Sequence, residues 1–246
     1  MRLRGENVYL TGAAGGLGSA LVPALLREGC TVICLDIKEM PRHLYGENEV
    51  LYRQVDLLDS SATEAIVEEI SELTGTPAAI INAAGLIHSE AFIKLSPSIV
   101  RHEVDVFRKV LASHLDSAFN ITGSVVARMI AARKRGAIIN IGSVNAEGVA
   151  GQSAYSAAKA GLSALSSVWS KELGALGIRS VCIEPGYIDS PPLREALSDL
   201  EIQKVKERTP TRQLVPMQDV VSMVIFALKT ESLNGTSIKV DMGLRN

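Results

Sequence analysis

The 246-residue sequence predicts an α/β fold in which a parallel sheet is covered by helices on both faces. Short apolar runs alternate along the chain with segments of helix length. Several of these runs lack the polar and apolar alternation of a half-exposed strand, as expected for strands buried on both sides. The length suits one large domain or two small ones. Because no linker, repeat or low-complexity tract interrupts the pattern, we expect a single domain over residues 1–246.

The expected elements follow the chain in regular order. Strands are expected at residues 7–12, 31–36, 50–57, 78–85, 136–143, 178–186 and 236–243. Helices are expected at residues 16–28, 60–74, about 97–134, 153–175 and 217–230. The segment 187–216 is instead rich in charge and proline, and it follows the carboxyl end of a strand. We expect it to form a lid over a substrate crevice.

Charge and cysteine content exclude several classes of function. The net charge is −2 and the isoelectric point is about 6.1, so we expect neither nucleic acid nor an anionic membrane as a partner. Cys30, Cys34 and Cys182 lie in apolar runs, which indicates reduced cysteines of a cytoplasmic protein. Because a strand begins by Val8, we expect no signal peptide, and because no apolar span is long enough, we expect no membrane helix.

The stretch "TGAAGGLG" (11–18) follows the first expected strand and opens the first helix. A dinucleotide pyrophosphate needs close backbone approach and helix-start N–H groups, and missing Cβ atoms allow both. A glycine cluster alone also fits an ordinary turn, but its place after a first strand favours nucleotide binding. The predicted phosphate-binding residues are Gly12, Gly15, Gly16, Leu17 and Gly18.

Asp36 ends the second expected strand, 18 positions after Gly18. A carboxylate at this point can accept hydrogen bonds from both ribose hydroxyls and repels a 2′-phosphate. No basic residue lies in the glycine turn, which also favours NAD over NADP. Lys38 lies close enough to keep NADP possible.

Ser143, Tyr155 and Lys159 form a candidate catalytic set. The expected helix 153–175 places Tyr155 and Lys159 one turn apart on one face, and Ser143 ends the fifth strand. Lowering a tyrosine pKa from about 10 to about 7 takes roughly 4 kcal/mol. We expect a nearby Lys159 and a positively charged nicotinamide to supply it, so that Tyr155 exchanges a proton as hydride moves. Ser143 would hold the substrate oxygen.

With these motifs, the chain resembles the short-chain dehydrogenase/reductase family from about Val8 to its end. The matching motifs are the glycine turn from Thr11 to Gly18, Asp56 in "VDL", "NAAG" (82–85), the Ser143, Tyr155 and Lys159 set, and "PGYIDS" (185–190). The resemblance implies a seven-stranded parallel Rossmann sheet, an NAD(P) cofactor and a homotetramer or homodimer.

The resemblance also implies roles for further residues. Asp56 and Leu57 would contact the adenine, and Lys159 would bridge the nicotinamide ribose hydroxyls. The remaining implied cofactor contacts are Asn82, Ala83, Ala84, Gly85, Tyr155, Pro185, Gly186, Ile188 and Ser190. The expected substrate contacts are Ser143, Asn145, Gln152 and Tyr187.

One position departs from the family pattern. "HLDSAFNIT" places His114 where family members usually have an asparagine that holds a water below the lysine. His114 replaces that asparagine in the relay, or is a neutral core histidine bonded to backbone, or marks weakened catalysis. We expect no metal site, because His43, His88 and His102 show no ligand spacing with it or with each other.

The leading functional expectation is an NAD-dependent oxidoreductase that interconverts a secondary alcohol and a ketone, with Ser143, Tyr155, Lys159 and His114 as the catalytic residues. Within this class, a sugar or polyol dehydrogenase and a 3-oxoacyl-type reductase using NADPH both remain open. Asp36 disfavours the NADPH-dependent 3-oxoacyl-type reductase, because its carboxylate repels a 2′-phosphate. A catalytically weak, NAD-binding regulatory or scaffold protein is the alternative from another class, and only His114 favours it.

Overall fold

The computed structural model describes residues 1–40, 50–95 and 97–244. Its centre is a seven-stranded sheet in the order β3-β2-β1-β4-β7-β8-β11, and every pairing in it is parallel. The strands are β1 (Asn7–Thr11), β2 (Thr31–Asp36), β3 (Val50–Gln54), β4 (Pro77–Asn82), β7 (Gly136–Ile141), β8 (Ile178–Pro185) and β11 (Thr236–Val240). The predicted fold class is confirmed.

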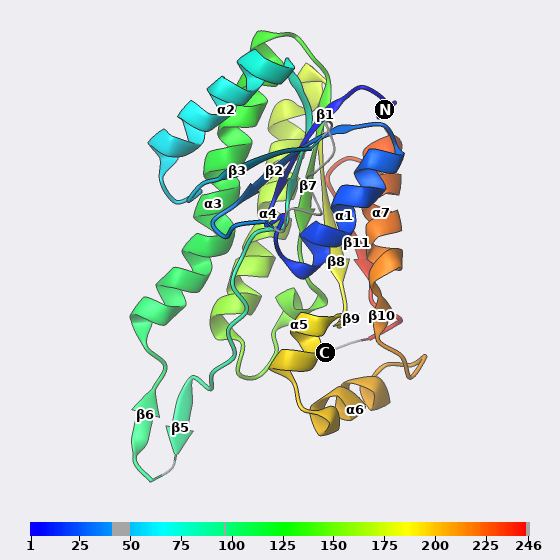
Figure 1. Ribbon diagram of the computed structural model, residues 1–246. Helices are drawn as coiled ribbons and strands as arrows, with labels where there is room; N and C mark the ends of the chain where they lie inside the picture. Colours follow the sequence, from blue (N-terminus) through cyan, green and yellow to red (C-terminus); the bar gives the residue numbers. More distant parts are fainter. Residues whose placement is uncertain (41–49, 96, 245–246) are drawn as a thin grey trace.

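Helices cover both faces of the sheet (Figure 1). One face carries α1 (Gly16–Arg27) and α7 (Met217–Lys229). The other carries α2 (Ser60–Thr74), α3 (Val104–Ala131) and α4 (Ser153–Leu173). Short 3₁₀ helices span Val144–Glu147 and Gly174–Leu176.

Strand alternation divides the core into two halves. In β1, Val8 and Leu10 pack with α1 and α7, whereas Tyr9 between them packs with α2, α3 and α4. All three side chains have no exposed surface. Because both faces of the strand are buried, it is apolar throughout, which is why its sequence shows no alternation.

The expected helix at 97–134 begins later than predicted. Instead, β5 (Ile93–Leu95) and β6 (Ile99–Arg101) pair as an antiparallel hairpin, and α3 starts only at Val104. The Ile and Val residues of this segment favour extended backbone. The hairpin projects from the body of the molecule at the lower left of Figure 1.

The segment 187–216 contains β9 (Ile188–Asp189), α5 (Pro191–Ala196), α6 (Asp199–Arg208) and β10 (Val215–Pro216). β9 and β10 pair in parallel and hold the ends of the segment together. A capping box of Ser198 and Glu201 starts α6. Figure 1 shows α5 and α6 beyond the carboxyl ends of the strands.

No helix among the described residues has both the length and the apolarity needed to cross a membrane.

Candidate active site

The strand order reverses at β1, which has β2 on one side and β4 on the other. In open parallel sheets, ligands bind beyond the carboxyl ends of the strands at such a point. Thr11, Asp36 and Asn82 end these three strands. The predicted cofactor residues from the glycine turn, β2 and β4 therefore share one edge of the sheet.

The glycine turn packs too tightly for side chains. A Cβ on Gly18 would lie 2.1 Å from the Gly12 carbonyl oxygen, and one on Gly12 would lie 2.8 Å from the Ala84 nitrogen. Gly15 caps α1 without a side-chain hydrogen bond, so the first N–H groups of the helix receive no side-chain acceptor from it. Bare backbone at a helix start fits the phosphates of a dinucleotide.

Thr11 ties this turn to the next strand. Its hydroxyl accepts hydrogen bonds from the backbone N–H groups of Ala83 and Ala84, both at 3.1 Å. Asn82 lies below them and donates to Thr122 at 2.9 Å and to Asn140 at 2.8 Å. Polar groups of the buried interior thus fix the "NAAG" segment against the glycine turn.

The Asp36 carboxylate is nearly buried and faces the glycine turn. One oxygen accepts from the Ala14 N–H and the other from the Lys38 N–H, each at 2.9 Å. Each carboxylate oxygen has a second lone pair, which leaves acceptor capacity for ribose hydroxyls. These contacts orient the carboxylate at the position predicted for the adenosine ribose.

Asp56 and Leu57 follow β3. Asp56 is exposed and accepts a hydrogen bond from the Leu58 N–H at 3.0 Å. The Leu57 side chain packs in the core, and its carbonyl accepts from Asn120 at 2.9 Å. Only its backbone remains for the predicted adenine contact.

The structure brings Ser143, Tyr155, Lys159 and His114 together. Ser143 hydrogen-bonds to Tyr155, and the Lys159 Nζ lies 5.5 Å from the centre of the Tyr155 ring. The His114 ring meets the Tyr155 ring edge-on, with centroids 5.5 Å apart. Lys159 is 5% exposed and donates to the Ile141 carbonyl at 2.7 Å. Four side chains, from the segment just after β7, from α3 and from α4, therefore form one cluster at the carboxyl edge of the sheet.

The protein alone does not lower the pKa of Tyr155 as expected. Desolvation raises it to about 12, and the Ser143 hydrogen bond only partly opposes this. Lys159 sits over the ring and donates to backbone, and burial lowers its own pKa to about 8. The described residues alone therefore favour the neutral phenol at neutral pH.

His114 is a neutral, backbone-bonded histidine in this structure. Its Nε2 lies 3.0 Å from the Leu86 carbonyl, which can only accept, so Nε2 carries the proton. Burial, together with the Lys159 charge, lowers the pKa of His114 to about 3. A Cβ on Gly85 would lie 1.9 Å from the imidazole ring, so glycine is required there. The buried Nδ1 makes no hydrogen bond to the described residues.

The predicted substrate residues lie around Ser143. The Asn145 N–H donates to the Ser143 hydroxyl at 3.1 Å, and the Asn145 side chain donates to Gln152 at 2.8 Å. Gln152 in turn donates to Ser89 at 3.2 Å. Tyr187 is half-buried just beyond β8. The amides of Asn145 and Gln152 thus give one side of this region a polar lining.

The predicted nicotinamide residues follow β8. Pro185 ends the strand, and the Gly186 N–H donates to the Val240 carbonyl at 2.9 Å. Ile188 lies in β9, and the Ser190 hydroxyl caps α5 by accepting from the Leu193 N–H at 3.4 Å. A Cβ on Gly16 would lie 3.3 Å from Pro192 in α5. The start of the predicted lid therefore touches the glycine turn.

Sequence reasoning missed several supporting groups. The carbonyls of Leu86 and Ile141 hold His114 and Lys159, and backbone acceptors leave no signal in a sequence. Asn140 donates to Ser166 at 2.6 Å and accepts from Asn82 in the buried network. Asn140 has a visible signal, because it is a polar residue within an apolar strand.

The sequence spacing of the histidines, from which we expected no metal site, does not show which of them meet in space. His88 and His102 lie apart in sequence, but the hairpin brings both beside Glu90. His43 lies outside the described residues.

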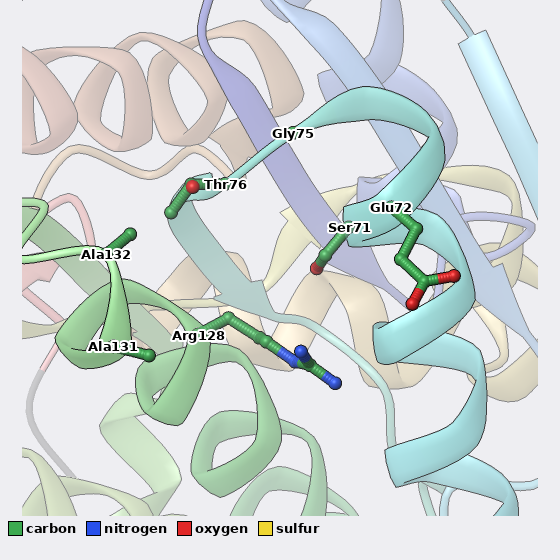
Figure 2. A pocket seen from close by; sticks show the side chains of 7 residues that line it. All are labelled: Ser71, Glu72, Gly75, Thr76, Arg128, Ala131 and Ala132. Carbon is green, nitrogen blue, oxygen red and sulfur yellow. The ribbon is translucent and has the colours of Figure 1, made fainter.

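A surface pocket lies at the opposite edge of the sheet, where β4 begins. It is lined by Ser71, Glu72, Gly75, Thr76, Arg128, Ala131 and Ala132. Figure 2 shows Arg128 reaching from α3 toward α2. The guanidinium already pairs with Glu68 at 2.7 Å, and none of the predicted site residues lines this pocket.

Comparison with known proteins agrees with this geometry. The family model for short chain dehydrogenases matches residues 6–201. A 3-oxoacyl-(acyl-carrier-protein) reductase from Thermotoga maritima is 32% identical over 253 residues, which cover 99% of each chain. A (3R)-3-hydroxyacyl-CoA dehydrogenase from Homo sapiens is 30% identical over 99% of this chain and 97% of its own. Sorbitol-6-phosphate 2-dehydrogenase from Klebsiella pneumoniae is 29% identical over 98% and 96%.

The match includes the glycine turn, the "NAAG" segment and the cluster of Ser143, Tyr155 and Lys159, and it extends over most of the chain. The relatives are oxidoreductases by name. The chain therefore belongs to the short chain dehydrogenase family and is an NAD(P)-dependent oxidoreductase that acts on CH–OH groups.

Proposed function

We propose that the protein interconverts a secondary alcohol and a ketone with NAD as the preferred cofactor. The observation that carries this proposal is the cluster of Ser143, Tyr155 and Lys159 beside the glycine turn. Tyr155 gives its proton to the carbonyl oxygen in reduction and takes the hydroxyl proton in oxidation. Ser143 holds the same oxygen by a hydrogen bond. A nicotinamide cofactor held beside this cluster would supply or accept the hydride.

Lys159 acts in this proposal as a cation that favours the phenolate and as a donor to the nicotinamide ribose. The glycine turn, Asp36, Asp56, the 82–85 segment and residues 185–190 would hold the rest of the cofactor. Residues 187–216 would close over the substrate as a lid, which is supported by the contact between Gly16 and Pro192.

The substrate class is best tested with a panel. By their names, the relatives act on 3-oxoacyl-(acyl-carrier-protein), on (3R)-3-hydroxyacyl-CoA and on sorbitol 6-phosphate. We therefore propose assaying short 3-hydroxyacyl thioesters, polyols and polyol phosphates, with their ketones, by nicotinamide absorbance with each cofactor. Turnover of one class with NAD supports the proposal. Cofactor binding without any turnover across the panel favours a regulatory or scaffold protein.

Replacing Asp36 by asparagine should weaken the preference for NAD. The change keeps the side-chain shape but removes the charge that repels a 2′-phosphate. We expect the ratio of kcat/KM with NAD to that with NADP to fall about 10-fold, which corresponds to about 1.4 kcal/mol. Steady-state kinetics with both cofactors measure it. A native enzyme that strongly prefers NADP would contradict the cofactor assignment.

His114 is proposed to position Tyr155 and to remain neutral during turnover. Because its pKa is lowered to about 3, it stays unprotonated throughout the range from pH 5 to 9. We expect His114→Asn to retain the rate within a few-fold and His114→Ala to lose about 10-fold, because the alanine leaves a cavity beside the Tyr155 ring. Neither variant should move the acidic limb of the pH profile of kcat. A shifted limb in His114→Ala would show instead that the imidazole passes the proton.

A homodimer or homotetramer is the proposed assembly. An apolar surface on α3 and α4 supports it, with Phe119 60% and Val168 45% exposed. The same surface is lined by Leu115, Asp116, Gly161, Ala164 and Leu165.

Three free, buried cysteines support a reducing compartment such as the cytoplasm. We propose no nucleic-acid or membrane partner, since the net charge is only −2.

A further inference from the structure

The base of the β5–β6 hairpin gathers three side chains able to bind a metal. His88 and Glu90 lie in the segment before β5, and His102 lies just after β6. The His88 Nε2 is 3.2 Å from the Glu90 Oε2, and the His102 Nε2 is 3.9 Å from the same oxygen. One ligand atom from each residue lies within 4.8 Å of the others. Closing the hairpin therefore creates a cluster that linear spacing does not reveal.

The hydrogen bonding of His102 leaves its Nε2 available to bind a cation. Its Nδ1 lies 2.9 Å from the Glu103 carbonyl, which can only accept, so Nδ1 carries the proton. In the neutral ring, Nε2 then has a lone pair, and this lone pair is near the negatively charged Glu90 Oε2. Histidines that bind metals are typically oriented by such a bond from the other ring nitrogen to a carbonyl. The His102 side chain is also 5% exposed, which fixes the ring in place.

The distances suit a tetrahedral zinc ion. Tetrahedral zinc bonds of about 2.0–2.2 Å to nitrogen and oxygen place neighbouring ligand atoms about 3.3–3.6 Å apart. The two distances to the Glu90 Oε2 are 3.2 and 3.9 Å, so small rotations of His88, which is 34% exposed, and of Glu90 would complete the geometry. Two histidines and one carboxylate form a common zinc donor set that leaves a fourth position for water.

Lys94 is the nearby group that opposes a metal. Its ammonium donates to the other carboxylate oxygen, the Glu90 Oε1, at 2.7 Å and is 52% exposed. This contact leaves the Glu90 Oε2 accessible to a cation, but the positive charge of Lys94 repels a cation bound there. Substitution of Lys94 therefore changes the zinc affinity of the site without replacing any of the three ligand residues.

We propose that His88, Glu90 and His102 form a binding site for a single Zn²⁺ ion. The ion joins the segment after β4 to the residue that follows β6 and so fixes the base of the hairpin. The site lies outside the cluster of Ser143, Tyr155 and Lys159, so the ion takes no part in hydride transfer.

The proposed site is linked to the substrate side of the enzyme. The Glu90 N–H donates to the Gly151 carbonyl at 2.6 Å, and Gln152 donates to Ser89 at 3.2 Å. Ordering the segment 88–90 therefore orders the loop that carries Gln152. If Gln152 contacts substrate, zinc removal raises KM more than it lowers kcat; this consequence rests on the proposed function, whereas zinc binding does not.

Calorimetric titration of the tag-free, chelator-treated chain with Zn²⁺ tests the site. We expect one ion per chain and a rise in Tm of a few degrees. Glu90→Gln should weaken binding about 100-fold, and His102→Gln should do the same. The matched control is Glu103→Gln, which changes a neighbouring carboxylate whose side chain is not a ligand and should bind like the native chain. Lys94→Gln should bind zinc a few-fold more tightly.

Three results would overturn the site. They are a native chain that binds no zinc, a Glu90→Gln variant that binds as the native chain does, and an equal loss in Glu103→Gln. Circular dichroism without zinc verifies that each variant is folded. One-to-one binding that is lost in Glu90→Gln upholds the site even when KM does not change, and that result removes only the link to Gln152.

Discussion

Replacing Tyr155 by phenylalanine is expected to lower kcat about 1,000-fold while the cofactor dissociation constant stays within a few-fold. Phenylalanine keeps the ring that packs beside His114 and Lys159 but removes the hydroxyl that exchanges the proton. Without it, the proton must come from or go to water during hydride transfer. The change therefore removes an interaction that matters in the transition state and spares ground-state binding.

Stopped-flow and steady-state absorbance of the nicotinamide, combined with calorimetric binding of NAD, measure both quantities. Tyr9→Phe is the matched control, because Tyr9 is buried in the core and its hydroxyl lies 3.3 Å from the Ser71 hydroxyl, away from the cluster. This control should keep native kcat. Native turnover in Tyr155→Phe would refute the assigned chemistry.

The sheet was predictable because burial on both faces leaves a strong pattern. Continuous apolar runs such as residues 78–81 mark strands covered by helices, and the glycine turn marks the first crossing from strand to helix. The hairpin at 93–101 was not predictable, because its apolar residues are exposed and follow no core periodicity. Leu95 is 79% and Ile99 is 74% exposed. Apolar residues continue from Ile99 into α3, so the sequence resembled one long helix from about residue 97.

The candidate site also has a part that the sequence predicts and a part that it does not. Ser143, Tyr155 and Lys159 were found because their spacing places them on neighbouring elements of a regular fold. Contacts to backbone carbonyls and contacts across the hairpin depend on tertiary structure. The Leu86 carbonyl beside His114 and the meeting of His88 with His102 are of this kind. The pKa of Tyr155 also depends on burial, which spacing alone does not give.

Lys159 imposes a conflict between stability and function. It is 5% exposed, and burial lowers its pKa from 10.5 to about 8, so the fold disfavours its charge. At neutral pH the lysine is nevertheless largely protonated, and one donor is satisfied by the Ile141 carbonyl. A buried charge that lowers the free energy of unfolding is typical of functional sites, which agrees with the catalytic role proposed for Lys159.

Replacing Lys159 by methionine should therefore stabilise the protein and inactivate it. At pH 7 the free energy of unfolding should rise by about 2 kcal/mol, the value left when the cost of charging is reduced by the lost hydrogen bond. A chain of this size would gain several degrees in Tm. Turnover should fall about 1,000-fold, because the phenolate loses its cation and the proton transfer loses its driving force.

The stabilisation produced by Lys159→Met should decrease as the pH rises. Between the folded pKa of about 8 and the unfolded value of 10.5, the unfolded native chain binds more protons than the folded chain. The stability of the native protein relative to the methionine variant therefore rises with pH across this window, and the advantage of the variant shrinks. Denaturant unfolding of both proteins at pH 7 and at pH 10 measures the difference. A gap that stays constant or widens would mean that Lys159 is not buried as a strained charge, and that its loss acts through packing alone.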